Sequence, residues 1–242
     1  MSWGRYRPPW WTGPYADRVP VRRDQPAVLL DLDGTLVDSR AGIVSGMNAT
    51  LRAHGLAERT AAELEVHIGP PIHETFAALF DVAPGDPRLD VLVAGYRERY
   101  AGGMLAGTLV FDGVLAALDD LQAAGYALAI ATSKAGPLAM TLADGLQLAG
   151  LMSAIVGPSP PARDDKATTI GMALAALGTP TRAVMVGDRR HDIEGAHAHG
   201  LPAIGALWGI GDRAELITAG ADALCASPRA LVSTVHKLLP VM

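Results

Sequence analysis

Short runs of apolar residues alternate along much of the chain with stretches of helical periodicity. The run Ala27–Leu30 is apolar throughout and rich in branched residues, which is typical of a strand buried on both faces of a parallel sheet. Similar runs recur in the second half of the chain at 127–131, 154–156, 183–186 and 203–207. Short strands that alternate with helices predict right-handed βαβ units. The pattern therefore predicts an α/β fold with a Rossmann-like parallel sheet.

Between the first strand and residue 106 the apolar residues follow only a helical period. Ser39 is placed to cap a first helix, and Thr60 with Glu63 has the spacing of a capping box. The clearest helical stretches in this region cover residues 39–54, 72–80 and 89–101. Because no strand pattern interrupts them, we expect a helical insertion placed directly after the first strand.

The sequence divides into three predicted parts. They are an amino-terminal arm of residues 1–25, an α/β core of residues 26–38 and 106–242, and a small α-helical cap of residues 39–105. The arm holds three of the four tryptophans together with several prolines and arginines, a composition unlike the rest of the chain. Two interpretations stay open: a mobile arm, or an aromatic and basic segment that docks on its own domain or on a protein partner.

Composition and charge narrow the class of protein. Hydrophobic residues make up 50% of the 242 residues, which predicts a sizeable core. The net charge of −5 argues against a nucleic-acid partner. No apolar run is long enough to span a membrane, and the first residues lack the apolar middle of a signal peptide. Cys225 has no partner for a disulfide, so we expect a cytoplasmic setting in which it is a small core residue.

An acidic pair, Asp31 and Asp33, follows the first predicted strand directly. Two carboxylates so close repel each other unless a positive charge lies beside them, and a hard divalent cation is the usual solution. Gly34 allows the chain to turn sharply after the pair. A calcium loop fits poorly, because Leu36 stands where such a loop needs glycine and the preceding element is a strand.

Further polar residues stand at or near the ends of later strands. They are Thr132, Ser133 and Lys134, then Lys166 at a helix start, then Asp188 and Asp192. The carboxyl ends of parallel strands meet at one edge of a sheet, so we expect these side chains to converge on the acidic pair. Taken one by one they have ordinary explanations as helix caps or surface charges. Their combination supplies what the transfer of a phosphoryl group requires.

The residue types suggest a role for each group. Asp31 is the predicted nucleophile, because Lys166 and Mg²⁺ together can offset its repulsion from an anionic phosphate. Asp33 is placed to protonate the leaving oxygen and then to activate water. Thr132 and Ser133, with the turn at Gly34, are expected to bind the phosphate oxygens.

The same pattern predicts a magnesium site. Its expected ligands are Asp31, Asp33, Asp188 and Asp192. A zinc site built from His191, His197 and His199 is the alternative, but these histidines lack the complete helical zinc signature.

The ordered motifs resemble those of the haloacid dehalogenase-like hydrolase superfamily. They are Asp31-Leu32-Asp33-Gly34-Thr35, Thr132-Ser133-Lys134, Lys166 and Gly187-Asp188-Arg189-Arg190-His191-Asp192. Within it, Ile68-Gly69-Pro70-Pro71 and Trp208-Gly209 are similar to the phosphoglycolate phosphatase-like and 5′-nucleotidase-like branch. The resemblance implies a helical C1-type cap and a Mg²⁺-dependent phosphatase that retains Asp33, the acid that the dehalogenating branch lacks.

The cap is expected to select the substrate. The turn Gly69-Pro70-Pro71, with His73 behind it, is the candidate for a loop that reaches into the pocket, and Lys134 is a further candidate for contact with the substrate. A plain connector between helices is the alternative for this turn. The small size of the cap favours a small phosphorylated metabolite such as phosphoglycolate, a nucleoside monophosphate or a sugar phosphate.

Three other functions stay open on the sequence alone. A phosphomutase would return the phosphoryl group from Asp31 to a second hydroxyl. A regulatory module would accept a phosphoryl group at Asp31 as a switch, although Asp33 would shorten the life of that switch. Because actinobacterial relatives of this branch include a protein described as acting in tyrosine phosphorylation, phosphoryl transfer on protein phosphotyrosine is the third.

Overall fold

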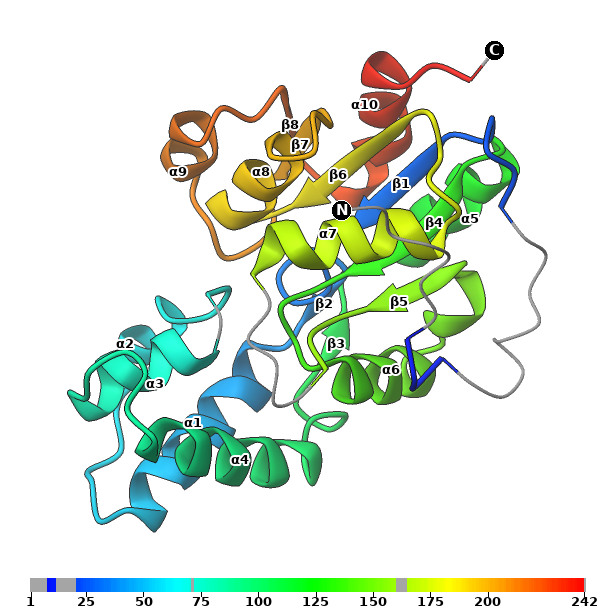
Figure 1. The fold of residues 1–242 in the computed structure, drawn as a ribbon. Helices are drawn as coiled ribbons and strands as arrows, with labels where there is room; N and C mark the ends of the chain where they lie inside the picture. The colour runs from blue at the N-terminus through cyan, green and yellow to red at the C-terminus, as the bar shows by residue number, and fades with distance from the viewer. Residues whose placement is uncertain (1–7, 12–20, 71, 160–164, 242) are drawn as a thin grey trace.

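A six-stranded parallel sheet forms the centre of the structure, a computed structural model that describes residues 8–11, 21–70, 72–159 and 165–241. The strand order is β5-β4-β1-β6-β7-β8 (Figure 1). The strands are β1 Ala27–Leu30, β4 Ala127–Ala131, β5 Ala154–Val156, β6 Ala183–Gly187, β7 Ala203–Ala206 and β8 Ala223–Cys225. All five neighbouring pairs run parallel. The predicted α/β fold is confirmed.

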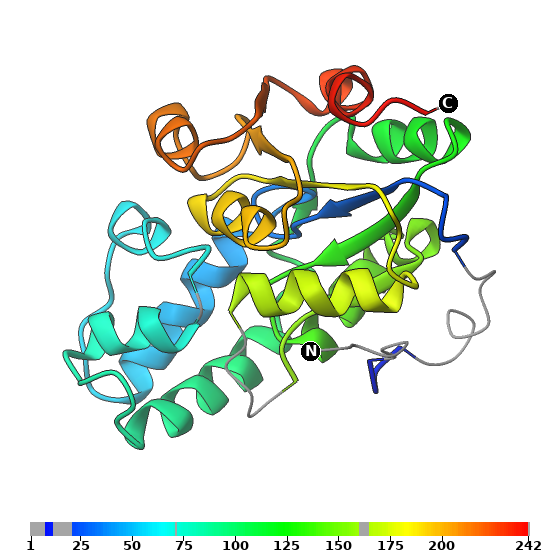
Figure 2. The same cartoon turned by 45° about the horizontal axis from the view of Figure 1, so that its top comes forward.

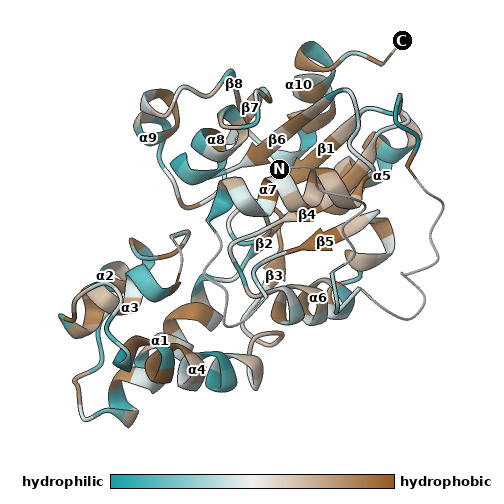
Figure 3. Ribbon diagram, in the orientation of Figure 1, coloured by the Kyte–Doolittle hydropathy of each residue, from teal (hydrophilic) through white to brown (hydrophobic). Residues whose placement is uncertain are grey.

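Both faces of the sheet are covered by helices. Val28 and Leu30 of β1 face one apolar cluster, whereas Ala27 and Leu29 face the other, because successive strand residues point to opposite sides. The first cluster includes residues of α5 Val114–Ala123, α6 Gly136–Gly145 and α10 Leu231–Leu238. The second includes residues of α7 Lys166–Ala176, α8 Arg190–His197 and α9 Arg213–Thr218. Figure 2 shows the sheet between these two layers, and Figure 3 shows that its strands are predominantly hydrophobic.

Four helices form an insertion between β2 and β3. They are α1 Arg40–Ala53, α2 Ala61–Glu65, α3 Ile72–Phe80 and α4 Arg88–Ala101. Figure 1 shows them to one side of the sheet, beyond the carboxyl ends of its central strands. The capping box of Thr60 and Glu63 is confirmed at the start of α2. The expected side-chain cap by Ser39 is wrong: Ser39 makes no cap hydrogen bond, because its hydroxyl donates to Asp33 instead.

Aromatic side chains form the centre of the helical insertion. The rings of Phe76 and Tyr96 lie 5.4 Å apart, and Tyr96 stacks on Tyr100 at 5.6 Å with an interplanar angle of 14°. Gly46 of α1 allows this close packing, because a Cβ atom there would lie 3.0 Å from the Tyr96 ring. The contact between α1 and α4 therefore depends on a small residue facing a large one.

A short antiparallel ribbon joins the insertion to the core. It pairs β2 Val37–Asp38 with β3 Leu109–Val110 and was not predicted, since two-residue strands have no readable period. The amide of Gly42 also donates to the carbonyl of Gly107 at 3.2 Å. The two chain segments that enter and leave the insertion are thus bonded to each other, and we refer to them as the stem.

Part of the amino-terminal arm packs against the core. Trp11 is buried in the first apolar cluster, and the Trp10 indole N–H donates to the Ile155 carbonyl at 3.3 Å. Residues 1–7 and 12–20 lie outside the described residues. Residues 8–11 therefore contact the core, while the predicted mobility of the arm and its role in docking stay predictions.

Replacing Gly107 by alanine should destabilise the stem. A Cβ atom there would lie 2.7 Å from the Gly42 Cα and 2.8 Å from its nitrogen, and backbone atoms cannot yield as a flexible side chain can. We expect Gly107→Ala to lower the free energy of unfolding by about 1–3 kcal/mol in urea denaturation. Gly103→Ala is the matched control, since nothing lies within 4 Å of its Cβ position. Equal stability of the two variants would contradict this account of the stem.

Candidate active site

Three carboxylates meet where the central strands end. Asp31 follows β1, Asp188 follows the neighbouring strand β6, and Asp192 lies in the first turn of α8. One oxygen from each lies within 4.8 Å of the others, and all three side chains are buried. The sequence placed these residues at one sheet edge, and the structure brings them together. Each role assigned to them stays a prediction.

Lys166 lies between two of these carboxylates. It begins α7, and its Nζ atom is 2.7 Å from both Asp31 Oδ1 and Asp192 Oδ1. Its side chain is only 5% exposed. Burial, the largest influence, lowers the pKa of Lys166, but Asp192 and Asp31 together outweigh it, and the pKa lies above its usual value. The ammonium is therefore held charged beside Asp31.

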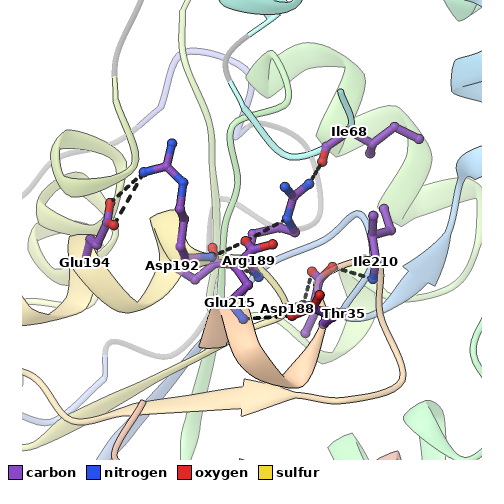
Figure 4. Close-up of polar contacts among 10 residues, drawn as sticks. Thr35, Ile68, Asp188, Arg189, Asp192, Glu194, Ile210 and Glu215 are labelled. Carbon is purple, nitrogen blue, oxygen red and sulfur yellow. Dashed lines mark hydrogen bonds and ion pairs between the residues drawn. The ribbon is translucent and has the colours of Figure 1, made fainter. Parts of the chain in front are cut away.

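Asp188 is packed in a narrow space. Thr35 Oγ1 donates to its Oδ1 at 3.0 Å, and the Ile210 amide donates to its Oδ2 at 2.8 Å (Figure 4). Gly34, with φ +88°, and Gly209 bring the backbone against this carboxylate. A Cβ atom at either glycine would fall within 2.3 Å of an Asp188 atom. Only glycine therefore fits at these two positions, because the backbone lies so close to Asp188. No role in the site was predicted for Gly209 from the sequence.

Burial changes the acidity of the cluster. It raises the pKa of Asp31 to about 6, where the charge of Asp192 adds to the effect and Lys166 opposes it. It raises the pKa of Asp188 to about 7, with the charges of Asp192 and Asp31 acting in the same direction. The cause is the cost of holding carboxylates near one another away from water.

The donor set fits a hard divalent cation. When all four groups are ionised, three carboxylates and one ammonium leave two negative charges in a buried space. Carboxylate oxygens are the ligands preferred by Mg²⁺, Mn²⁺ and Ca²⁺. The zinc alternative gains no support, because His197 faces Asp222 at 3.1 Å and His199 faces the Ala167 carbonyl at 2.7 Å.

Asp33 lies apart from this cluster and has its own partners. Its Oδ1 accepts a hydrogen bond from Ser39 at 2.5 Å, and its Oδ2 is 3.1 Å from the Lys134 ammonium. Asp33 is not in the group of three carboxylates found among the described residues. Its predicted place as a fourth metal ligand stays a prediction, while its place beside the pocket is compatible with proton transfer.

A pocket opens between the sheet edge and the helical insertion. From the core it is lined by Asp31, Asp33, Thr132, Ser133, Lys134, Ala135 and Leu138. From the insertion it is lined by Ile43, Met47, His67, Ile68, Gly69, Pro70, Ile72, Tyr96, Arg97 and Tyr100. The expected phosphate-binding residues Thr132 and Ser133 therefore share a pocket with Asp31 and Asp33.

The predicted cap loop is only partly where it was expected. Gly69 and Pro70 line the pocket, and Pro71 lies outside the described residues. His73 is not among the lining residues, and its Nε2 lies 3.3 Å from Asp90 Oδ1 within the insertion. This contact between α3 and α4 gives His73 a structural explanation.

Arg189 connects the core to the loop before Gly69. Its Nε donates to Glu215 at 2.9 Å, and its Nη1 donates to the Ile68 carbonyl (Figure 4). The Arg189 amide also donates to Asp192 Oδ2 at 3.0 Å. Asp192 thus accepts a backbone hydrogen bond at the start of α8 and is also one of the three clustered carboxylates. The contact with Ile68 joins residues 121 positions apart, so local sequence carried no signal for it.

Comparison with known proteins defines the class. The family described as haloacid dehalogenase-like hydrolase matches residues 28–206, most of the chain. The chain belongs to this family of hydrolases. The fold agrees: a predicted phosphatase from Clostridium acetobutylicum superposes with a TM-score of 0.84 at 30% identity, covering 88% of this chain and 99% of that one.

Individual relatives carry several names. The tyrosine-protein kinase PtkA of Mycobacterium tuberculosis is 42% identical over 193 residues, which cover 78% of this chain but 64% of PtkA. A 5′-nucleotidase of Pseudomonas aeruginosa is 35% identical over 85% of this chain and 93% of its own length. A phosphoglycolate phosphatase of Agrobacterium fabrum is 33% identical over 77% of this chain and 82% of its own length. The resemblance to the phosphoglycolate phosphatase-like and 5′-nucleotidase-like branch is confirmed.

Binding of a divalent cation should weaken as the pH falls. Because their pKa values are raised to about 6 and about 7, Asp31 and Asp188 carry protons increasingly below pH 7, and a cation must displace them. By titration calorimetry with Mg²⁺ we expect the Kd to be at least about tenfold higher at about pH 5.5 than at about pH 8.

Two variants control the calorimetric experiment. Asp188→Asn should lose binding at both pH values, whereas Asp119→Asn should behave as the wild type, because Asp119 is exposed on α5. An affinity independent of pH would contradict the assignment of these carboxylates to the cation site.

Proposed function

We propose that the protein is a Mg²⁺-dependent phosphatase of a small phosphomonoester that acts through an aspartyl-phosphate at Asp31. The observation that carries this proposal is the Asp31 carboxylate, which lines the pocket and lies 2.7 Å from the Lys166 ammonium. Membership of the hydrolase family supports it, as do the names of the 5′-nucleotidase and phosphoglycolate phosphatase relatives.

In the first half of the reaction an Asp31 oxygen attacks phosphorus and forms a P–O bond. The bond from phosphorus to the leaving oxygen breaks, and Asp33 gives that oxygen a proton. Lys166 offsets the repulsion between Asp31 and the phosphate. Thr132, whose Oγ1 also accepts the Lys134 amide at 3.1 Å, and Ser133 bind the phosphate oxygens.

In the second half water attacks the phosphorus of the aspartyl-phosphate. Asp33 takes a proton from that water, the bond between phosphorus and Asp31 breaks, and inorganic phosphate leaves with Asp31 and Asp33 restored. Asp188 and Asp192, with Asp31, would hold the Mg²⁺ ion. Bound there, Mg²⁺ supplies positive charge against the transferring phosphoryl group.

The pocket lining supports a compact and anionic substrate. Its wall on the insertion is largely apolar, with Ile43, Met47 and Tyr96, and Arg97 is the one arginine among the described lining residues. Arg97 is half-buried, and burial lowers its pKa. A guanidinium removed from water in this way favours an anionic partner, which a carboxylate on the substrate would supply. Phosphoglycolate carries such a group.

The setting and partners form part of the same proposal. We place the protein in the cytoplasm because its one cysteine, Cys225, is free and buried. Among the residues that the structure describes, none of the helices combines the length and the hydrophobicity that a membrane span requires. The partner is a small phosphorylated metabolite. Residues 8–11 of the arm contact the core, and docking on a second protein has no support from the described residues.

Phosphoryl transfer involving protein tyrosine is a second candidate. The 42% identity to the tyrosine-protein kinase PtkA favours it, although the chain spans only 64% of that relative's length. Incubation with ATP and an acceptor protein, followed by detection of phosphotyrosine, tests it. Phosphotyrosine formed by the wild type and not by Asp31→Asn would support this candidate over hydrolysis.

Replacing Asp31 by asparagine should abolish turnover without unfolding the protein. The change keeps the shape of the side chain but removes the nucleophile, so we expect phosphate release to fall at least about 10³-fold on a panel of phosphomonoesters with Mg²⁺. Chelation of Mg²⁺ should have the same result. Asp119→Asn is the control, and thermal melting checks the fold. Full activity of Asp31→Asn would refute the nucleophile.

Arg97→Gln should impair the use of an acidic substrate selectively. For phosphoglycolate we expect kcat/KM to fall about tenfold, mainly through KM, because the variant loses a contact to the carboxylate. For p-nitrophenyl phosphate, which has no carboxylate, kcat/KM should stay within about twofold. Arg99→Gln is the matched control, since Arg99 is exposed on the same helix and donates to the Gly95 carbonyl. Equal losses on both substrates would contradict an anionic subsite.

A further inference from the structure

Lys134 carries a buried ammonium with partners from two parts of the molecule. Its side chain is 7% exposed, although lysine is seldom buried without paired charge. The Nζ atom lies 3.1 Å from Asp33 Oδ2, in the core, and donates to the Tyr100 hydroxyl at 2.9 Å. It also lies 4.3 Å from the centre of the Tyr100 ring. The ammonium thus connects Asp33, the residue predicted to act first as acid and then as base, to Tyr100 of α4.

The electrostatics of this contact favour a charged lysine. Burial is the largest single influence and lowers the pKa of Lys134, but Asp33, Tyr100 and Tyr96 together raise it above its usual value. Burial also raises the pKa of Tyr100, so its hydroxyl stays protonated and accepts the ammonium hydrogen through an oxygen lone pair. A cation that faces a carboxylate, a hydroxyl and an aromatic ring has little freedom to move.

Asp33 is held from both of its oxygens. Lys134 faces Oδ2, and the Ser39 hydroxyl donates to Oδ1 at 2.5 Å. Ser39 immediately precedes α1, the first helix of the insertion, and Tyr100 lies in the last turn of α4, the fourth. One donor to Asp33, Ser39, therefore lies at the start of the insertion. The other donor, Lys134, belongs to the core but contacts Tyr100 at the end of the insertion.

Tyr100 is in turn fixed by the packing of the insertion. It stacks on Tyr96, and a Cβ atom at Gly46 of α1 would lie 3.4 Å from its own Cβ. A displacement of α4 relative to the core would move the hydroxyl that Lys134 contacts. The orientation of Asp33 is therefore linked to the place of α4.

We propose that Lys134 is a positioning residue, which orients Asp33 for proton transfer and makes that orientation depend on Tyr100 of the helical insertion. Lys134 itself forms no bond with the reacting atoms. The kinetic part of this inference rests on the proposed phosphatase function, whereas the contact itself does not.

The choice of leaving group separates a positioning role from a structural one. Departure of glycolate from phosphoglycolate needs a proton from Asp33, but departure of p-nitrophenolate does not. In Lys134→Met we expect kcat/KM for phosphoglycolate to fall about 10²-fold and kcat/KM for p-nitrophenyl phosphate to change less than about threefold. Tyr100→Phe should show the same pattern at about fivefold, since it keeps the ring and the lysine. Lys237→Met, an exposed lysine of α10, is the control.

Two kinetic outcomes would overturn the proposal. Equal losses on both esters would indicate damage to binding or folding, and no loss on either would show that Asp33 is oriented without Lys134. If Lys134→Met fails to fold, Tyr100→Phe still tests the proposal, because it alters the same contact and keeps the lysine. A loss of kcat/KM for phosphoglycolate in Lys134→Met but not in Tyr100→Phe would refute the claim that the orientation of Asp33 depends on the insertion.

An NMR measurement decides the contact independently of any activity. The ¹⁵Nζ signal of Lys134, assigned by its loss in Lys134→Met, should be protected from exchange in the wild type. It should shift in Tyr100→Phe and broaden or disappear in Asp33→Asn. No protected signal, or a signal that neither variant alters, would refute the bridge. If the wild type hydrolyses neither ester, the phosphatase proposal fails, while this spectrum still tests whether Lys134 bridges Asp33 and Tyr100.

Discussion

An excess of buried negative charge is the constraint on which the site depends. Among the described residues, Asp31, Asp188 and Asp192 share a small space with one ammonium, that of Lys166. Three hydrogen-bond donors oppose this repulsion: the Thr35 hydroxyl and the backbone amides of Ile210 and Arg189. The remaining imbalance is what a divalent cation would neutralise. Stability and chemistry are therefore linked at this point, since the arrangement that binds a cation is unfavourable without one.

Much of the core could be predicted because its determinants are local. A buried parallel strand has a characteristic apolar run, and the residue after it must lie at the sheet edge, so Asp31, Thr132 and Asp188 could be placed from sequence alone. Lys166 was harder, because a lysine at a helix start is usually exposed. Its place became evident only from its order among the other motifs, and its 2.7 Å contacts with two carboxylates agree with that place.

The contacts that cross from the insertion to the core could not be predicted. Ser39 has the residue type and position of a helix cap, and only the folded structure shows that Asp33 competes for its hydroxyl. Lys134 and Tyr100 are 34 residues apart, and Arg189 reaches a carbonyl 121 residues away. Such contacts depend on where the insertion lies over the sheet. No periodicity or spacing encodes that position, which is also why the substrate is the least determined part of the function.

The stem has a consequence for how this fold can diversify. The chain leaves the core at Val37–Asp38 and returns at Leu109–Val110, and these two segments pair with each other rather than with the six-stranded sheet. Everything between them is thus joined covalently to the core through the stem alone, outside the ladder that sets the register of β1. Helices could be lengthened, lost or exchanged there without shifting Asp31 relative to Asp188. A covalent connection confined to one stem allows the same carboxylate cluster to acquire a different substrate pocket by replacement of one continuous segment.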